Sequence, residues 1–267
     1  MWEKYDINKI DPEVLDVSSK RFEGQTVLLH ELIDNLRYII FKFFSKNDEP
    51  LMSPLEVINK VIVDIKYPLD ARGNPTDFHY FQAFRRFLGR CMKTYRNDFD
   101  FFQFASETAW MKMGDCEDSS ILTAAGLENL KALGQCDYFV SFGAVYYQEQ
   151  LLGYHGWVVV KINNVWRLVE TTLDTPYSSE FEMVSIDINK NKWKVGELLY
   201  ESFVLFNKEK LWEWVEGDDD YMTCLYEAGD VLKQYLEKTH KEKETKKKYK
   251  EMSKAYMKFM NKKTKVK

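Results

Sequence analysis

Three short stretches of the 267-residue sequence contain side chains suited to nucleophilic chemistry. Cys116 lies in the run Gly-Asp-Cys-Glu-Asp-Ser-Ser, His155 in Gly-Tyr-His-Gly-Trp, and Glu170 at the end of Trp-Arg-Leu-Val-Glu. A thiol attacks a carbonyl as its thiolate. An imidazole can remove the thiol proton, and a carboxylate can fix the imidazole tautomer. The three residues therefore predict a nucleophile, a general base and an orienting acid.

The elements around these residues can position them. A polar run followed by apolar residues predicts a helix that starts near Cys116 and ends at Gly134. A helix N-terminus favours negative charge and so favours a thiolate. After Gly134 the pattern changes to segments rich in Val, Tyr and Phe, which predict strands over 138–147, 154–162 and 165–171, with further strands near 182–188 and 199–206.

The turn between two of these strands sets their pairing. Asn163-Asn164 is suited to a two-residue hairpin turn, because Asn tolerates positive φ. The numbers of paired residues then add up to about 327. This register places His155 opposite Thr172 and diagonal to Glu170, on one face of the pair and within side-chain reach.

The acidic neighbours of Cys116 leave three interpretations open. Asp115, Glu117 and Asp118 oppose thiolate formation by like-charge repulsion. They can be solvated surface acids, they can cap the helix through Asp115 or Asp118, or they can bind a hard cation such as calcium, which prefers carboxylate oxygens.

The other cysteines, Cys91, Cys136 and Cys224, are expected to be buried and inert. The four cysteines show no Cys-x-x-Cys pair and no zinc-ligand spacing, so we expect neither a zinc site nor a disulfide framework.

Composition and charge distribution indicate a globular body with a basic tail. The sequence is 45% hydrophobic and 15% aromatic, which excludes global disorder. It has no apolar run of membrane-spanning length and no signal-peptide pattern at its start, so we expect no transmembrane segment and a cytoplasmic location. Residues 238–267 contain 13 Lys and 3 Glu, a local net charge of +10, against a net charge of -4 for the chain. The remaining residues therefore carry a net charge of -14.

The chain divides into three expected regions. Residues 1–50 form an N-terminal helical segment with a helix over 21–46, and residues 51–210 form the core. The core begins with a helix that Ser53 caps and that runs to about Lys66. A loop over 68–75 and aromatic helices over 77–95 and 99–112 follow. Residues 211–267 form a C-terminal helical extension with the Lys-rich tail.

The Lys-rich tail has several candidate partners. It can bind nucleic acid, an acidic membrane surface or the acidic body of the same protein, or it can be a solvated amphipathic helix packed by its stripe of Tyr, Met and Phe. No Arg occurs in it, which argues against specific base readout.

The motif set resembles that of the transglutaminase-like superfamily, most closely its prokaryotic cysteine peptidases. The resemblance covers roughly residues 55–206: Gly-Asp-Cys-Glu-Asp before an apolar helix, His-x-Trp on a strand, a carboxylate after Trp-x-Leu-Val, and upstream segments at 57–61 and 65–70. It implies an α+β fold of papain-like type, with the nucleophile at a helix N-terminus packed on an antiparallel sheet and with flanking N- and C-terminal helices.

The resemblance also implies roles for single residues. It makes Cys116 the nucleophile, His155 the base and Glu170 the orienting acid, although the family's usual acid is Asp; Asp174 is a weaker candidate. Some relatives with Asp-Cys-Glu-Asp bind calcium there, which makes Asp115, Glu117 and Asp118 candidate ligands. The backbone N–H of Cys116 would form part of an oxyanion hole, and Gln103 and the Trp110 region precede it as candidates for the second donor.

The expected activity is thiol-dependent hydrolysis of a peptide or isopeptide amide in a protein substrate, through an acyl-enzyme on Cys116. Release by an amine, as in a transferase, stays open, and no cofactor is required beyond the candidate calcium. The alternative is a non-catalytic binding or structural module that keeps the fold.

Overall fold

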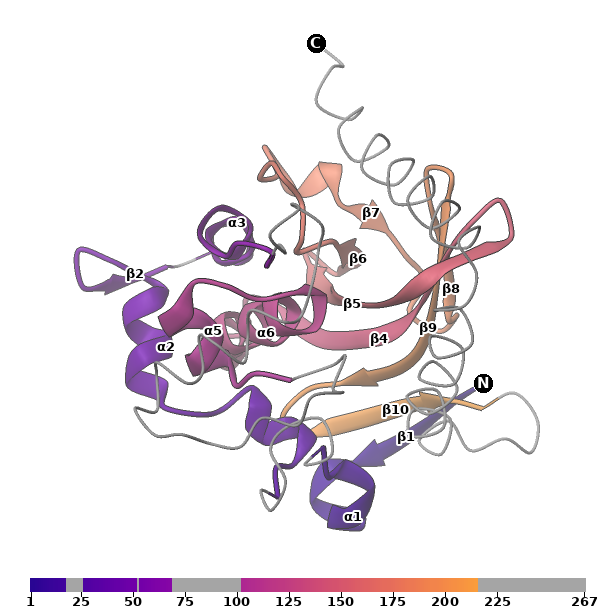
Figure 1. The fold of residues 1–267 in the computed structure, drawn as a ribbon, viewed down its shortest axis with the longest axis horizontal. Coiled ribbons are helices and arrows are strands. Elements are labelled where there is room, and N and C mark those ends of the chain that lie inside the picture. Colours follow the sequence, from indigo (N-terminus) through magenta and orange to yellow (C-terminus); the bar gives the residue numbers. More distant parts are fainter. Residues whose placement is uncertain (18–25, 52, 69–101, 216–267) are drawn as a thin grey trace, which may run out of the picture.

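The computed structural model describes residues 1–17, 26–51, 53–68 and 102–215, which form one antiparallel sheet with helices gathered on one side of it (Figure 1). The eight-stranded sheet has the order β1-β10-β9-β4-β5-β6-β7, and β8 pairs with β9. The helices are α1 (Pro12–Leu15), α2 (Arg37–Phe43), α3 (Pro54–Asp64), α5 (Ala105–Met111) and α6 (Cys116–Ala132). This architecture confirms the predicted α+β class.

The strands differ widely in length. They are β1 (Trp2–Asp6), β4 (Asp137–Tyr147), β5 (Gln150–Ile162), β6 (Val165–Val169), β7 (Val184–Ser185), β8 (Lys192–Val195), β9 (Leu198–Phe206) and β10 (Lys210–Trp214), with a separate pair β2 (Ser45–Lys46) and β3 (Glu49–Pro50). Short 3-10 helices lie at Ile7–Lys9, Leu29–Leu32 and Glu180–Glu182. Helix α6 packs across the two long central strands, β4 and β5.

The core lies on both faces of the sheet. On the helix side, Val158 of β5 packs with Leu122 of α6 and Ile58 of α3, all fully buried. On the opposite side, Trp157 packs with Tyr200 and Leu205 of β9. Burial on both faces explains why the centre of β5 reads as an unbroken apolar run rather than an alternating one.

The sequence predicted the centre of the fold well. Helix α6 begins at Cys116 and is followed by Gly134 at φ 71°, the left-handed conformation that suits glycine after a helix. The turn residues Asn163 and Asn164 have φ of 51° and 62°. Val158 pairs with Val169, so paired numbers add up to 327 as predicted.

The start of α3 is also confirmed. The Ser53 hydroxyl accepts a hydrogen bond from the Glu56 N–H at 3.2 Å and donates to the Glu56 carboxylate at 3.0 Å. The helix ends at Asp64, two residues before the predicted end.

The described N-terminal segment is less helical than predicted, and the described start of the C-terminal extension is a strand. The helix predicted over 21–46 begins only at Arg37, because Leu36 adopts a left-handed φ of 46° that interrupts any helix running through it. Residues 2–6 and 210–214 are strands, and β1 pairs with β10 at the edge of the sheet. The alternating Lys-Leu-Trp-Glu-Trp of β10 is a two-residue period that the sequence analysis missed, as it missed β8.

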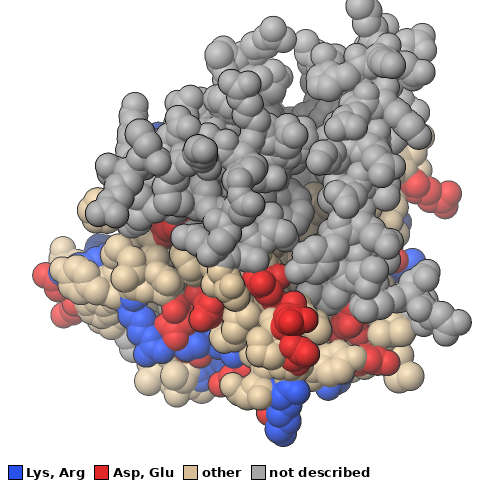
Figure 2. All heavy atoms as spheres, turned by 60° about the horizontal axis from the view of Figure 1, so that its bottom comes forward, with Lys and Arg blue, Asp and Glu red and all other residues tan. Residues whose placement is uncertain are grey.

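Several predictions fall outside the described residues. These are most of the loop at 68–75, the helix at 77–95, the start of the helix predicted at 99–112, Cys91, Cys224 and the C-terminal extension beyond Val215. Among the described helices, none is long and apolar enough to cross a membrane. On the face shown in Figure 2, the visible acidic and basic side chains are intermixed.

Candidate active site

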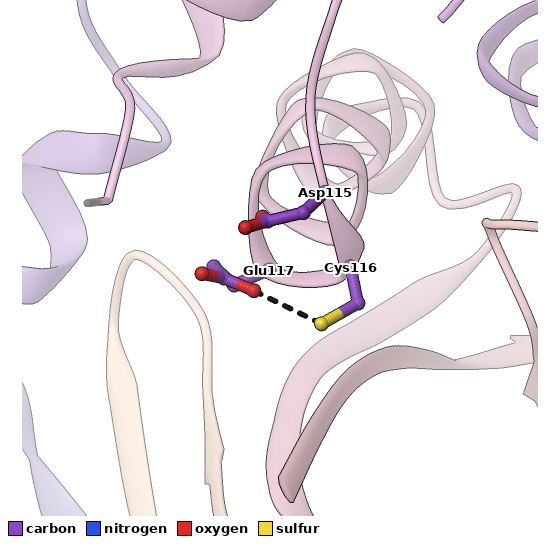
Figure 3. Close-up of side chains that lie close together, drawn as sticks. All are labelled: Asp115, Cys116 and Glu117. Atoms are coloured by element: carbon purple, nitrogen blue, oxygen red, sulfur yellow. Dashed lines mark hydrogen bonds between the residues drawn. The ribbon is translucent and has the colours of Figure 1, made fainter. Parts of the chain in front are cut away.

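Cys116 is the first residue of α6, as the sequence predicted. Its side chain is buried, and its thiol donates a hydrogen bond to Glu117 Oε2 at 2.9 Å (Figure 3). The backbone N–H of Gly156, on β5, donates to the same sulfur. The nucleophile candidate therefore lies where the N-terminus of α6 meets β5.

His155 and Glu170 form a direct pair. His155 lies on β5, Glu170 follows β6, and His155 Nε2 is 2.7 Å from Glu170 Oε2. The His155 side chain is 14% exposed and the Glu170 side chain 6%. The predicted hairpin register brings the two together, although β6 ends at Val169 and does not reach Thr172. Asp174, the weaker acid candidate, is exposed.

The Glu170 carboxylate has further donors. Oε1 accepts from the Thr172 N–H at 3.1 Å and from the Thr172 hydroxyl at 2.7 Å. Oε2 also accepts from the Tyr200 hydroxyl at 3.2 Å. Sequence reasoning missed both donors. Thr172 has a local signal, a hydroxyl two residues after the acid, whereas Tyr200 comes from β9 and has none.

Aromatic rings hold the imidazole. The Trp157 ring lies 6.1 Å from the His155 ring at 28°, and the Tyr200 ring lies 6.3 Å from it. Trp157 and Tyr200 contact each other edge-to-face at 5.1 Å. These two buried rings, with the hydrogen bonds to Glu170, leave the imidazole little rotational freedom.

Opposite charges set the pKa values of this pair. Burial alone would lower the pKa of His155, but the charge and hydrogen bond of Glu170 outweigh it and raise that pKa. Burial alone would raise the pKa of Glu170, but His155 and the Thr172 donors outweigh it and lower that pKa. Glu170 therefore makes His155 a stronger base, which can accept a proton as the neutral imidazole at pH above its raised pKa.

Gly156 links the pair to the thiol. A Cβ at this position would lie 2.9 Å from Glu117 Cα, a distance that real Cβ atoms essentially never show, and 3.0 Å from Glu117 N, which is tighter than nearly all real contacts. A residue without a Cβ lets the β5 backbone contact the first turn of α6. The structure therefore joins His155 to Glu170 directly. Cys116 is connected to this strand through Gly156. Among the described residues, its sulfur donates to Glu117 and accepts from the Gly156 N–H.

The three acids next to Cys116 are buried, so the interpretation that they are solvated surface acids is wrong. Asp115 is 2% exposed, Glu117 8% and Asp118 0%. Asp115 occupies the N-cap position, but its side chain makes no capping hydrogen bond. Glu117 is covered by the contact between the first turn of α6 and Gly156 of β5, which no local sequence pattern reveals.

Asp118 binds Gln103. Asp118 Oδ1 accepts from the Gln103 backbone N–H and Oδ2 from its side-chain amide, both at 2.7 Å. The same amide donates to the Met113 carbonyl at 3.3 Å. Gln103, a candidate for the second oxyanion donor, thus already uses its amide hydrogens inside the protein. Trp110, from the other candidate region, is 62% exposed on α5.

Like charges set the pKa values of this turn. Burial raises the pKa of the Cys116 thiol well above its ordinary value, and the charges of Glu117 and Asp115 raise it further against the Gly156 N–H. Burial also raises the pKa of Asp118, with Glu117 adding to it and the Gln103 donors opposing it. In this arrangement Cys116 is held as a thiol.

A metal site in this turn would differ from the predicted one. Potential ligand atoms of Asp115, Cys116 and Glu117 lie within 4.8 Å of one another, whereas Asp118 is engaged with Gln103. Calcium takes six to eight oxygen ligands. Asp115 and Glu117 supply at most four carboxylate oxygens, so backbone carbonyls or waters would have to complete a calcium shell. The calcium site stays a prediction, and calcium enters no step of the proposed mechanism.

Cys136, predicted to be buried and inert, is only partly buried, and its inertness stays a prediction. It lies partly buried at the end of α6, and burial raises its pKa to about 12.

Comparisons with known proteins add only distant likenesses. No family model matches the chain, and no curated protein matches it. Among solved structures, LapG of Legionella pneumophila after EGTA treatment has a TM-score of 0.35 and 14% identity over 67% of this chain and 74% of that chain. A second structure of Legionella pneumophila LapG has a TM-score of 0.35 and 14% identity over 72% of this chain and 80% of that chain. A candidate cysteine protease from Cytophaga hutchinsonii has a TM-score of 0.33 and 14% identity over 82% of this chain and 64% of that chain. At this level the likenesses assign neither a family nor an activity to the chain.

Proposed function

We propose that this protein is a thiol hydrolase that cleaves a peptide or isopeptide amide through an acyl-enzyme on Cys116. One observation carries the proposal. His155 is paired with Glu170 at 2.7 Å, and the next residue of the same strand, Gly156, donates its N–H to the Cys116 sulfur. This arrangement supports a nucleophile at the N-terminus of α6, served by a base on β5 and an orienting acid directly after β6.

The first chemical step is acylation. His155 takes the thiol proton as the Cys116 sulfur attacks the amide carbonyl carbon, and the carbonyl π electrons move onto oxygen. As this oxyanion collapses, the C–N bond breaks and the amine leaves with the proton from His155. The Cys116 backbone N–H, among the first N–H groups of α6 that lack an intrahelical partner, can donate to the oxyanion.

The second step is release. His155 removes a proton from water, the hydroxide attacks the thioester carbon, and the C–S bond breaks as the proton returns to sulfur. The products are a carboxylic acid and the free thiol. Glu170 keeps the imidazole oriented through both steps, because its two oxygens are fixed by Thr172 and Tyr200.

The electrostatics favour general-base catalysis over a preformed thiolate. The raised pKa of Cys116, caused by burial and its acidic neighbours, keeps the proton on sulfur in the resting protein. The proton must then move to His155 during attack. We also propose that the fold is transglutaminase-like and that the Lys-rich tail has a binding role. The alternative tested against this proposal is a non-catalytic module that keeps the fold.

The test measures alkylation of the cysteines by iodoacetamide as a function of pH, with mass spectrometry to separate the sites. We expect Cys116 to react faster than Cys136 near neutral pH, because His155 can accept its proton whereas burial raises the pKa of Cys136 to about 12. His155→Ala should bring the Cys116 rate to that of an ordinary buried thiol, and His30→Ala is the matched control on the 3-10 helix at Leu29–Leu32.

Activity completes the test. Cys116→Ala and His155→Ala should each abolish cleavage of a decapeptide library of randomised sequence, read by mass spectrometry. If Cys116 reacts like Cys136 and His155→Ala changes nothing, the hydrolase proposal fails and the non-catalytic module is the better description.

A further inference from the structure

One edge of β5 is open beside the thiol. Strand β6 pairs only with Val158–Ile162, whereas β5 continues back to Gln150 with β4 on its other side. Within the described residues, no strand pairs with the β6 side of residues 150–157. An unpaired strand edge presents N–H and C=O groups that another extended chain can use.

The register shows which groups point to this edge. In a two-residue hairpin the residues that flank the turn, Ile162 and Val165, form a hydrogen-bonded pair, and bonding alternates along the strand. The even-numbered residues of β5 therefore direct their N–H and C=O groups toward the β6 side, down to Tyr154. Leu152 lies at the register shift against β4, where the alternation breaks.

The Cys116 sulfur lies on the same edge. It accepts the N–H of Gly156, which the alternation directs to the β6 side, so the hydrogen bond independently supports that assignment. Tyr154, two residues along, then directs its N–H and C=O to the same edge. The Cys116 sulfur and the Tyr154 N–H and C=O, which pair with no strand in the described part of the chain, therefore face the same edge.

The chain after β6 does not close this edge. The N–H of Glu170 donates to the Tyr177 hydroxyl at 3.0 Å, and the N–H of Thr172 donates to the Glu170 carboxylate. By the hairpin alternation these even-numbered amides point away from β5. Strand β6 ends at Val169, and within the described residues no backbone hydrogen bond is found between residues 170–173 and β5.

Two tyrosines lie near this part of β5, Tyr154 on β5 itself and Tyr146 on the neighbouring β4. Tyr154 lies opposite Ala144, which places Tyr154 and Tyr146 as diagonal neighbours on the helix-side face of the sheet. Tyr154 is 53% exposed. Burial and a hydrogen bond with Glu201 raise the pKa of Tyr146 to about 12, so this ring is anchored and uncharged.

We infer that the open edge of β5 binds the substrate as an added strand: an extended polypeptide segment whose backbone pairs with the N–H and C=O of Tyr154. This inference rests on the proposed function and names its substrate class. Two residues along an added strand is about 7 Å. The scissile amide therefore lies within about two residues of the one paired with Tyr154, next to the sulfur. The substrate is a locally unfolded stretch of protein, with an apolar or aromatic side chain against Tyr146 and Tyr154.

The test removes one backbone donor. Tyr154→Pro deletes the outward N–H of an edge position, where proline is tolerated, and leaves the bonds to β4 intact. We expect kcat/KM for peptides cleaved from the randomised decapeptide library to fall about 5- to 10-fold, the effect of one lost hydrogen bond. The rate at which iodoacetamide alkylates Cys116 should stay the same, so the ratio of kcat/KM to this rate should fall by the same factor. Tyr154→Ala, which keeps the N–H, should retain more peptide cleavage than Tyr154→Pro.

A matched control uses another edge strand. Lys4 on β1 directs its N–H outward, since Ile7 and Met1 form the bonds to the β10 side, so Lys4→Pro makes the same change far from the site. Lys4→Pro should leave peptide cleavage unchanged. A substrate peptide N-methylated at single positions should lose cleavage at one position beside the scissile bond, which reports the same pairing without any variant.

The outcomes separate this inference from the proposed function. Equal peptide cleavage by Tyr154→Pro and wild type, or indifference to N-methylation, overturns the added strand and leaves the hydrolase standing. A fast, His155-dependent Cys116 that cleaves no peptide overturns the substrate class alone. A Cys116 that reacts like Cys136 overturns both.

Discussion

The two halves of the candidate site have opposite electrostatics. The base half, His155 and Glu170, pairs opposite charges at 2.7 Å and surrounds the carboxylate with donors. The nucleophile half, the first turn of α6, places a thiol among three buried carboxylates. The base half is organised for the charged state it needs, whereas the nucleophile half resists the charged state it needs.

The two halves therefore respond to pH differently: the base half loses stability toward both low and high pH, whereas the nucleophile half loses stability as pH rises. The lowered pKa of Glu170, caused by His155 and Thr172, contributes stability above its unfolded pKa that is lost as pH falls through the folded value. The raised pKa of His155, caused by Glu170, contributes stability below its unfolded pKa that is lost as pH rises through the folded value. The raised pKa of Asp118, caused by burial, makes this residue destabilising once pH exceeds its unfolded pKa.

The largest expected effect comes from breaking the base half. Glu170→Gln removes the charge that raises the pKa of His155, so that pKa should fall and the acid limb of the pH–rate profile should move to lower pH. The peak kcat/KM should drop by about 10²- to 10⁴-fold, because the imidazole loses its orienting acceptor. Steady-state cleavage from pH 4 to 9 measures both changes.

Glu49→Gln, on the exposed β3, is the control for Glu170→Gln and should match wild type. If the acid limb of the pH–rate profile of Glu170→Gln matches that of wild type, Glu170 does not raise the pKa of His155. The contrast between the two halves would then be lost.

A smaller effect should follow from separating the halves. Gly156→Ala places a Cβ against the backbone of Glu117, which must move, and overpacking of this kind costs about 1–3 kcal/mol. Urea unfolding should show that loss, and peptide cleavage should fall because β5 moves away from α6. Gly153→Ala is the matched control, since nothing lies within 4 Å of its added Cβ. Equal stability of the two variants would show that the contact is loose.

The base half could be predicted from sequence because it is local. The turn Asn163-Asn164 fixes the hairpin register, and the register alone brings His155 to Glu170. The start of α6 at Cys116 is local for the same reason: a polar run precedes an apolar one. Hairpins and helix starts depend on neighbouring residues, so a single sequence contains their signal.

The nucleophile half could not be predicted because it depends on distant contacts. Buried Asp118 binds Gln103, fifteen residues earlier, and Glu117 lies against Gly156 of β5. Likewise, β1 and β10 pair the two ends of the described chain, and the sequence at either end gives no sign of the other. A row of acids on a surface helix and a row of acids buried under a strand have the same one-dimensional pattern.

The smallest expected effect sharpens the comparison from the nucleophile side. After burial, Glu117 is the leading cause of the raised pKa of Cys116, through its charge, and it also accepts the thiol hydrogen bond. Glu117→Gln removes the charge, so the pKa of Cys116 should fall and its alkylation by iodoacetamide at pH 7 should become several-fold faster. Cys136 in the same molecule is the internal reference, because its rate should not change.

Glu117 also reaches across to the base half, since its charge adds to the raised pKa of His155. Glu117→Gln should therefore shift the acid limb of the alkylation profile to lower pH, in the same direction as Glu170→Gln but by less. A double variant tests this: if the halves share Glu117, its two shifts combine less than additively. Strict additivity, or a Cys116 rate in Glu117→Gln no faster than wild type, would mean that burial alone holds the proton on sulfur.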